Sequence, residues 1–220
     1  MKLREETNML TSYHTVKKLG QHEIIIQKSR FICFLNRATT ETDAQNFIEK
    51  IKKEHWNATH NCSAYIIGEH DDIQKANDDG EPSGTAGVPM LEVLKKRQLK
   101  DTVVVVTRYF GGIKLGAGGL IRAYGGAVSE GLKAVGIVER RLMQVMRTTV
   151  DYTWLGKLEN ELHQSPYQIK AINYLEQVLI ETYVEANDVE AFQQWMTNMT
   201  NGQATIQAGE KEYLESDIVE

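Results

Sequence analysis

The first part of the chain carries apolar residues in stretches that are typical of β-strands. Residues 1–12 are polar and show no period, and we expect a loose arm or a short helix there. Residues 22–26 and 30–35 are rich in β-branched and aromatic side chains, and Gly20 predicts a turn just before them. Residues 61–68 repeat the strand pattern. The N-terminal part is therefore expected to contribute several strands.

Apolar residues recur at helical spacing in three stretches of the first 140 residues. Thr42 with Gln45 three residues later predicts a capping box at the start of the first helix. A second helix is expected over residues 88–96. Pro89 falls in its first turn, where a proline is tolerated. A third helix is expected over residues 118–135, where several small residues favour close packing on a sheet.

Six further elements are expected after a join at Arg140 and Arg141. Pro166 separates a helix from the strand that follows it, and Asn187 with Glu190 three residues later predicts the cap of another helix. The order strand, helix, strand, strand, helix, strand is that of the ferredoxin-like plait, so the fold class is α+β. The expected ranges are 144–152, 153–163, 168–174, 177–185, 188–199 and 204–214.

The length of 220 residues suits two small domains, which we place at residues 1–140 and 141–220. With 41% hydrophobic and 25% charged residues, the composition is that of a soluble globular protein. Apolar runs are short, with five residues at 31–35 and four at 103–106, and the first twenty residues contain no apolar segment. We therefore expect neither a membrane span nor a secretory signal. Cys33 and Cys62 cannot form a disulfide framework, so the expected location is the reducing cytoplasm.

The net charge of −5 is divided unevenly along the chain. Residues 1–140 contain 20 Lys and Arg against 17 Asp and Glu, whereas residues 141–220 contain 5 against 13. We therefore expect an anionic partner to bind the first part, because the second part repels it. The segment 95–122 has a single acidic residue, Asp101, and seven basic residues: Lys95, Lys96, Arg97, Lys100, Arg108, Lys114 and Arg122.

A glycine-rich loop follows the predicted buried strand at residues 102–110 and precedes the third helix. Such a loop directs backbone N–H groups and the positive end of a helix dipole to one spot, and Arg108, Lys114 and Arg122 lie beside it. This pattern predicts binding of an anion or of an RNA backbone, with a tight structural turn or a small-nucleotide pocket as the alternatives. The G-x-G-x-x-G and P-loop fingerprints are absent. The loop amides expected to contribute are those of Gly116, Gly118 and Gly119.

Asp78, Asp79 and Glu81 form an acidic loop ahead of the second helix. Three carboxylates in four residues could bind Mg²⁺ or Ca²⁺, or act as acid and base. They lack the spacing of an EF-hand, and we favour a structural role or contact with a basic partner. No metal site and no catalytic residue is assigned.

His55, His60 and Cys62 contain metal-binding side chains, but their spacing is not that of a zinc site and no second pair of ligands exists. Core packing or hydrogen bonding is the better interpretation.

Uninterrupted motifs lie at residues 29–31, 60–65, 78–87 and 107–124, and in these motifs the chain closely resembles the Impact family. The resemblance covers about residues 15–135, and it implies a fold like that of domain 2 of ribosomal protein S5. The remaining acidic part resembles a small ferredoxin-like domain, similar to domain V of elongation factor G, that bacterial members append.

The resemblance also implies a connection with translation, because eukaryotic relatives regulate translation during amino-acid starvation. Their protein partner does not carry over, since they have a different domain in place of the acidic plait. The expected function is that of a non-enzymatic cytoplasmic protein, without a cofactor, that binds RNA or the ribosome and regulates translation. The alternatives are a metal- or phosphate-dependent hydrolase acting between the acidic and glycine-rich loops, and a protein-interaction module.

Overall fold

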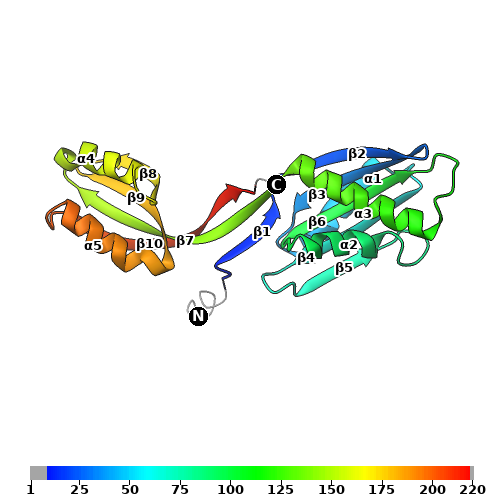
Figure 1. Ribbon diagram of the computed structural model, residues 1–220, viewed down its shortest axis with the longest axis horizontal. Coiled ribbons are helices and arrows are strands. Elements are labelled where there is room, and N and C mark those ends of the chain that lie inside the picture. The colour runs from blue at the N-terminus through cyan, green and yellow to red at the C-terminus, as the bar shows by residue number, and fades with distance from the viewer. Residues whose placement is uncertain (1–8, 219–220) are drawn as a thin grey trace. The chain divides into compact units, whose positions relative to one another are not determined.

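The computed structural model describes residues 9–218 and contains two compact units (Figure 1). One unit runs to Arg140 and includes the C-terminal segment from Glu215, and the other is Arg141–Leu214. Both combine helices with mainly antiparallel strands. The predicted α+β class and two-part organisation are confirmed.

The first unit is built on a five-stranded antiparallel sheet in the order β2-β3-β6-β4-β5. Helix α1 packs on one face of this sheet, and α2 and α3 pack on the other (Figure 1). A short strand, β1, precedes the sheet. The bounds are β1 Ser12–Val16, β2 Gly20–Ile26, β3 Ser29–Arg37, α1 Glu41–Glu54, β4 His60–Ile67, β5 Ile73–Asn77, α2 Gly87–Lys96, β6 Thr102–Tyr109 and α3 Gly116–Val135.

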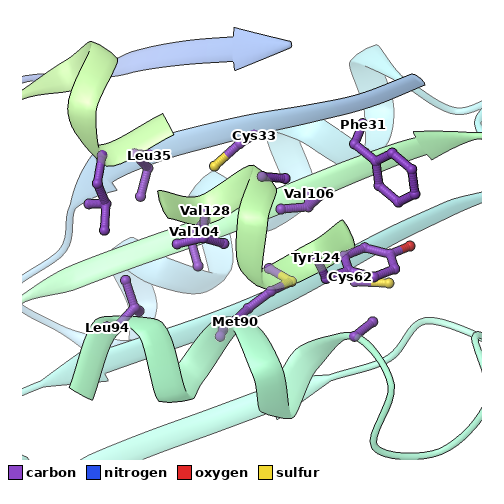
Figure 2. Packing of buried hydrophobic residues seen from close by; sticks show 14 of the residues in the cluster. Phe31, Cys33, Leu35, Cys62, Met90, Leu94, Val104, Val106, Tyr124 and Val128 are labelled. Atoms are coloured by element: carbon purple, nitrogen blue, oxygen red, sulfur yellow. The ribbon is translucent and has the colours of Figure 1, made fainter. Parts of the chain in front are cut away.

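The central strand β6 is buried on both faces, which explains its run of four valines. Val104 and Val106 point to the α2 and α3 side, where Figure 2 shows them with Cys33, Tyr124 and Val128. The two valines that alternate with them, at positions 103 and 105, face α1. Burying a side chain of this size stabilises the folded state by about 1.5–3 kcal/mol. Apolar packing on both faces therefore stabilises the sheet.

The capping box of α1 is formed by Thr40 and Asp43, and the prediction of Thr42 with Gln45 is wrong. The Asp43 amide donates to Thr40 Oγ1 at 3.1 Å, and the Thr40 amide donates to Asp43 Oδ2 at 3.2 Å. Thr42 lies inside the first turn, because the helix begins at Glu41. Both pairs satisfy the three-residue spacing, but only Thr40 has the extended backbone that an N-cap requires.

Thr40→Ala is expected to lower the free energy of unfolding by about 1 kcal/mol, because an orphan amide loses its acceptor. Thr42→Ala serves as the control and is expected to change stability by less than about 0.5 kcal/mol. Urea-induced unfolding followed by circular dichroism measures both. Equal losses in the two variants would contradict the assigned cap.

Three further details of the first unit differ from the sequence predictions. β5 was not predicted, because its first residue is half-buried and the other four are exposed, so it lacks an apolar alternation. α3 begins at Gly116, two residues earlier than expected. Gly20 is the first residue of β2 rather than part of a turn.

The second unit has the predicted βαββαβ order, and its strands pair in the sequence β10-β7-β9-β8. One apolar cluster, which includes Met146, Leu158, Ile180 and Phe192, joins its two helices to the sheet. The bounds are β7 Ile137–Val150, α4 Tyr152–His163, β8 Gln168–Tyr174, β9 Val178–Glu185, α5 Val189–Met199 and β10 Thr205–Asp217.

Two sequence interpretations of this region are corrected. β7 starts at Ile137, before the expected start at residue 144, and it runs without a break through Arg140 and Arg141, where the two units divide as expected. Asn187 does not cap α5: it lies in a 3-10 turn, and the cap position is Asp188, which makes no capping bond with its side chain. Among residues 9–218, no helix is both long enough and apolar enough to cross a membrane.

Candidate functional site

The acidic loop and the glycine-rich loop meet at one cleft of about 430 Å³. The register of the sheet brings them together, because His60 at the start of β4 pairs with Arg108 near the end of β6. The acidic loop contributes Glu81 to the cleft, and the glycine-rich loop contributes Lys114. The complete lining is Thr59, His60, Glu81, Pro82, Arg108, Phe110, Lys114, Leu115, Gly116, Ala117 and Leu120.

The glycine-rich loop needs glycine at specific positions. A Cβ on Gly111 would lie 2.1 Å from the carbonyl carbon of Lys28, so the two backbones approach too closely for any side chain. The Gly111 amide also donates to Ser29 Oγ at 3.1 Å. Gly112 and Gly116 have φ values of 85° and 67°, in the left-handed region that favours glycine. The loop is therefore anchored to β3 before it enters α3.

The N-terminus of α3 is open to the cleft. No side chain caps this helix, and its first turn contains no acidic residue. The first four amides of a helix have no partner within it and carry a partial positive charge. Lys114 is exposed just before the helix and lines the same cleft. Of the expected loop glycines, Gly116 lines the cleft together with Ala117, whereas Gly118 and Gly119 lie in the first turn of α3 but outside the cleft lining.

Arg108 is buried rather than exposed, with 5% of its surface accessible. Its Nη1 donates to Glu81 Oε1 at 2.6 Å, and the Tyr124 hydroxyl donates to the same oxygen at 2.8 Å. Arg108 Nε is buried without a hydrogen-bond partner. The charge that the sequence analysis assigned to an anion is thus already paired with Glu81.

Arg122 lies on the exposed side of α3 and outside the cleft lining. Its Nη1 is 3.6 Å from the position that a Cβ on Gly118 would occupy, so the guanidinium is beside the first turn of the helix. Of the three basic residues expected at the loop, Lys114 faces the cleft, Arg122 flanks it, and Arg108 forms its buried wall.

Asp78 fixes the acidic loop to the start of α2. Its Oδ1 accepts hydrogen bonds from the amides of Ala86 and Gly87 at 3.0 and 2.8 Å, and its Oδ2 accepts one from Gly84 at 2.7 Å. Burial alone would raise the pKa of Asp78, but these backbone hydrogen bonds outweigh it and hold the pKa below its ordinary value. The carboxylate therefore acts as a structural cap.

Asp79 ties the acidic loop to α1 and β4. Its Oδ1 is 2.6 Å from Lys52 Nζ, and its Oδ2 accepts the Asn61 amide at 2.7 Å. The Asp79 carbonyl bonds to His60 Nδ1 at 2.8 Å. Within residues 9–218, no group of three or more His, Cys, Asp and Glu side chains could hold a metal ion. The loop's carboxylates are occupied by partners within the protein.

Asp78→Asn is expected to lower the free energy of unfolding at neutral pH by about 1.5–3 kcal/mol, because bonds to a charged acceptor are lost. A carboxylate with a lowered folded pKa contributes stability above its unfolded pKa of about 3.9, and loses it as pH falls through the folded pKa. The difference from wild type should therefore shrink below about pH 4. Urea unfolding at several pH values measures this difference in the free energy of unfolding. Asp72→Asn, at an exposed aspartate, is the control. A difference that stays the same at low pH would contradict the capping role of the Asp78 carboxylate.

Sequence reasoning missed three contributors to the cleft. Tyr124 fits the apolar stripe of α3, but its hydroxyl reaches Glu81. Figure 2 shows the Tyr124 side chain beside that of Cys62. Burial raises the pKa of the Cys62 thiol to about 12. Phe110 directly follows β6, which ends at Tyr109, and is 45% exposed. His60 was interpreted as a residue for core packing or hydrogen bonding; its Nδ1 does bond to the Asp79 carbonyl, but the residue also lines the cleft. A tyrosine on a buried stripe was the one available signal, because its hydroxyl needs a partner.

Comparison with known proteins places both units in one family. Residues 27–132 match the family described as the Impact N-terminal domain, and residues 148–203 match a domain of unknown function, DUF1949. The IMPACT family member YvyE of Bacillus subtilis (strain 168) is 69% identical over 210 residues, which are 96% of this chain and 97% of that protein.

More distant relatives cover most of the chain as well. The IMPACT family member YigZ of Escherichia coli (strain K12) is 35% identical over 188 residues, or 84% of this chain and 92% of that protein. A solved structure described as the crystal structure of a hypothetical protein has a TM-score of 0.58 and 32% identity, and it covers 93% of this chain and 100% of its own. Since such relatives match along nearly its whole length, the chain belongs to the Impact family.

Proposed function

We propose that this protein binds RNA, free or in the ribosome, and regulates translation without catalysing a reaction. The observation that carries the proposal is the uncapped N-terminus of α3, which opens into a cleft beside the exposed Lys114. Helix amides and a lysine are the groups that bind phosphate in many proteins. The protein would act in the cytoplasm, where ribosomes are found.

The pairing of Glu81 supports this proposal. An unpaired carboxylate in the cleft would repel a phosphate, but Arg108 and Tyr124 both donate to Glu81 Oε1. The charges left to act on a ligand are therefore those of Lys114, the helix N-terminus and the nearby Arg122. All three groups carry positive charge and therefore favour the binding of an anion.

The proposal assigns different roles to the two parts of the chain. Residues 1–140, with 20 Lys and Arg against 17 Asp and Glu, would form the RNA-binding domain. Residues 141–220, with 5 against 13, would form a separate ferredoxin-like domain that does not contact phosphates.

Lys114→Ala is expected to weaken binding of a short unstructured RNA and to reduce the slope of log K against log salt by about 0.7, the contribution of one phosphate contact. Lys53→Ala is the matched control, because Lys53 is an exposed lysine of α1, on the opposite face of the sheet. Fluorescence anisotropy of the full chain between about 50 and 200 mM salt measures both.

Two results would contradict RNA binding at the cleft. One is an affinity that does not depend on salt, and the other is an equal loss in the Lys114→Ala and Lys53→Ala variants. If the wild type instead retains a protein partner after nuclease treatment and binds no RNA, the function is that of a protein-interaction module.

His60 favours a second candidate, hydrolysis of a phosphoester in the same cleft. The Asp79 carbonyl can only accept a hydrogen bond, so His60 Nδ1 carries a proton and the ring is held in one orientation. Its Nε2 is 3.8 Å from Glu81 Oε2 and belongs to the cleft lining. An oriented imidazole beside a carboxylate is suited to general acid–base catalysis. Release of product from RNA or nucleotides, lost in His60→Ala, would support this candidate, and no release by the wild type would exclude it.

A further inference from the structure

We infer that the cleft accepts one unpaired nucleotide of a single-stranded RNA, with its base stacked on Phe110 and its phosphate at the N-terminus of α3. This inference rests on the proposed RNA binding and specifies the form of RNA that the site takes. It depends on Phe110, a large aromatic residue that lines the cleft and is 45% exposed.

Phe110 is held as a rigid platform rather than as a loose surface side chain. The Arg108 guanidinium carbon lies 5.4 Å from the centre of the Phe110 ring and 5.3 Å from that of Phe31. Phe31 in turn packs edge-on against Tyr124, with the ring centres 5.3 Å apart. A guanidinium held over an aromatic face stabilises the ring's position. The Phe110 ring is therefore supported by buried side chains and is itself partly exposed.

The backbone of Phe110 is fixed as well. Its amide donates to Thr59 Oγ1 at 3.0 Å, and the next residue, Gly111, bonds to Ser29. Because the chain is anchored on both sides of the ring, little conformational entropy is lost when a flat ligand stacks on it. Preorganisation of this kind favours binding by stacking.

The remaining lining supplies two kinds of surface, one apolar and one suited to binding phosphate. Pro82, Leu115 and Leu120 supply apolar surface, whereas Lys114 and the first amides of α3 supply positive charge. A nucleotide has the same division, with a flat base and an anionic phosphate. The volume of about 430 Å³ lies within the range of about 300–1,000 Å³ that is usual for small-ligand sites, so it suits one nucleotide.

The base must be unstacked to reach Phe110, and this selects single-stranded RNA. In a duplex the bases are paired and stacked inside the helix, where a side chain at the end of a cleft cannot reach their faces. Every base has a π-face, so stacking on one ring gives little preference for base type. We expect discrimination between unpaired and paired RNA, with weak discrimination between sequences.

The test measures fluorescence anisotropy of the full chain with an unstructured RNA oligonucleotide and with its duplex. Phe110→Leu, which keeps an apolar side chain but loses the ring, is expected to weaken single-strand binding about 5-fold to 150-fold. Phe110→Trp should retain the affinity, and the fluorescence of the new indole should be quenched when RNA is added. Ile113→Ala is the control, because Ile113 is 42% exposed in the same loop but lies outside the cleft lining.

The outcomes separate this inference from the proposed function. If the duplex binds as tightly as the single strand and Phe110→Leu has no effect while Lys114→Ala weakens binding, stacking is disproved and RNA binding stands. If the wild type binds neither RNA, both fail. Weaker binding of Phe110→Leu together with quenching in Phe110→Trp supports the inference, whereas weaker binding without quenching overturns it.

Discussion

Arg108→Met is expected to lower the free energy of unfolding by about 3–5 kcal/mol, because it leaves the Glu81 carboxylate buried without its cation. Glu81 is 7% exposed, and its Oε1 accepts Arg108 Nη1 at 2.6 Å. The Tyr124 hydroxyl and His60 Nε2 would remain beside the charge, at 2.8 and 3.8 Å from its oxygens. Urea-induced unfolding of the full chain measures the loss.

A double substitution shows whether the loss comes from the unpaired charge. Adding Glu81→Gln to Arg108→Met removes the charge and keeps an acceptor for the Tyr124 hydroxyl, so it should recover on the order of 1–3 kcal/mol. Lys114→Met, an exposed lysine of the same cleft, should change stability by less than about 0.5 kcal/mol. If Arg108→Met is as mild as Lys114→Met, the buried pair does not stabilise the fold.

Gly111→Ala is expected to lower the free energy of unfolding by about 3 kcal/mol or more and to abolish RNA binding. The added Cβ would lie 2.1 Å from the Lys28 carbonyl carbon and 2.5 Å from the Ser29 nitrogen. These are backbone atoms of the turn into β3, so no side-chain rotation relieves the overlap. The loop must move away from β3, and the N-terminus of α3 moves with it.

Gly126→Ala provides the control within the same glycine-rich segment. A Cβ at Gly126 would meet no atom within 4 Å, and the residue lies inside α3. The substitution should therefore stabilise the protein by about 0.5–1 kcal/mol, the usual gain for alanine in a helix. Thermal unfolding and RNA anisotropy measure both variants. A Gly111→Ala protein that is as stable as wild type and binds RNA would contradict the close approach of the loop to β3.

Arg108 and Lys114 differ in what their substitution reports about binding at the cleft. Loss of RNA binding in an Arg108 variant would report damage to the fold as readily as loss of a contact, because Arg108 is a buried structural partner of Glu81. Lys114 is exposed and lines the cleft, so its removal reports on binding. The basic residues of this loop are therefore not interchangeable as test sites.

Periodicity in the sequence predicts most of the elements, because it reflects which face of each element is buried. The strand at Gln168–Tyr174 matches its predicted range fully, and α2 and β6 differ from theirs by one residue. β5 escaped prediction because an edge strand with four exposed residues has no apolar face to detect. The cap of α1 was misplaced because two threonines, Thr40 and Thr42, satisfy the same spacing.

The candidate site is predictable only in part, since its chemistry depends on the pairing of strands. The sequence indicates an acidic loop and a basic glycine-rich loop, but it does not show that β4 and β6 place His60 opposite Arg108. That register brings Glu81 and Arg108 into a buried pair and leaves Phe110 exposed in the cleft lining. Spacing along the chain predicts neither the buried ion pair nor the position of Phe110 in the cleft.

The most direct test of RNA binding at this cleft is an amide-resolved NMR titration of the full chain with a short unstructured RNA at low salt. We expect the largest chemical-shift changes at Phe110, Lys114 and the first amides of α3, and no change in the unit Arg141–Leu214. Changes that are confined to Arg141–Leu214, or the absence of any change, would contradict it.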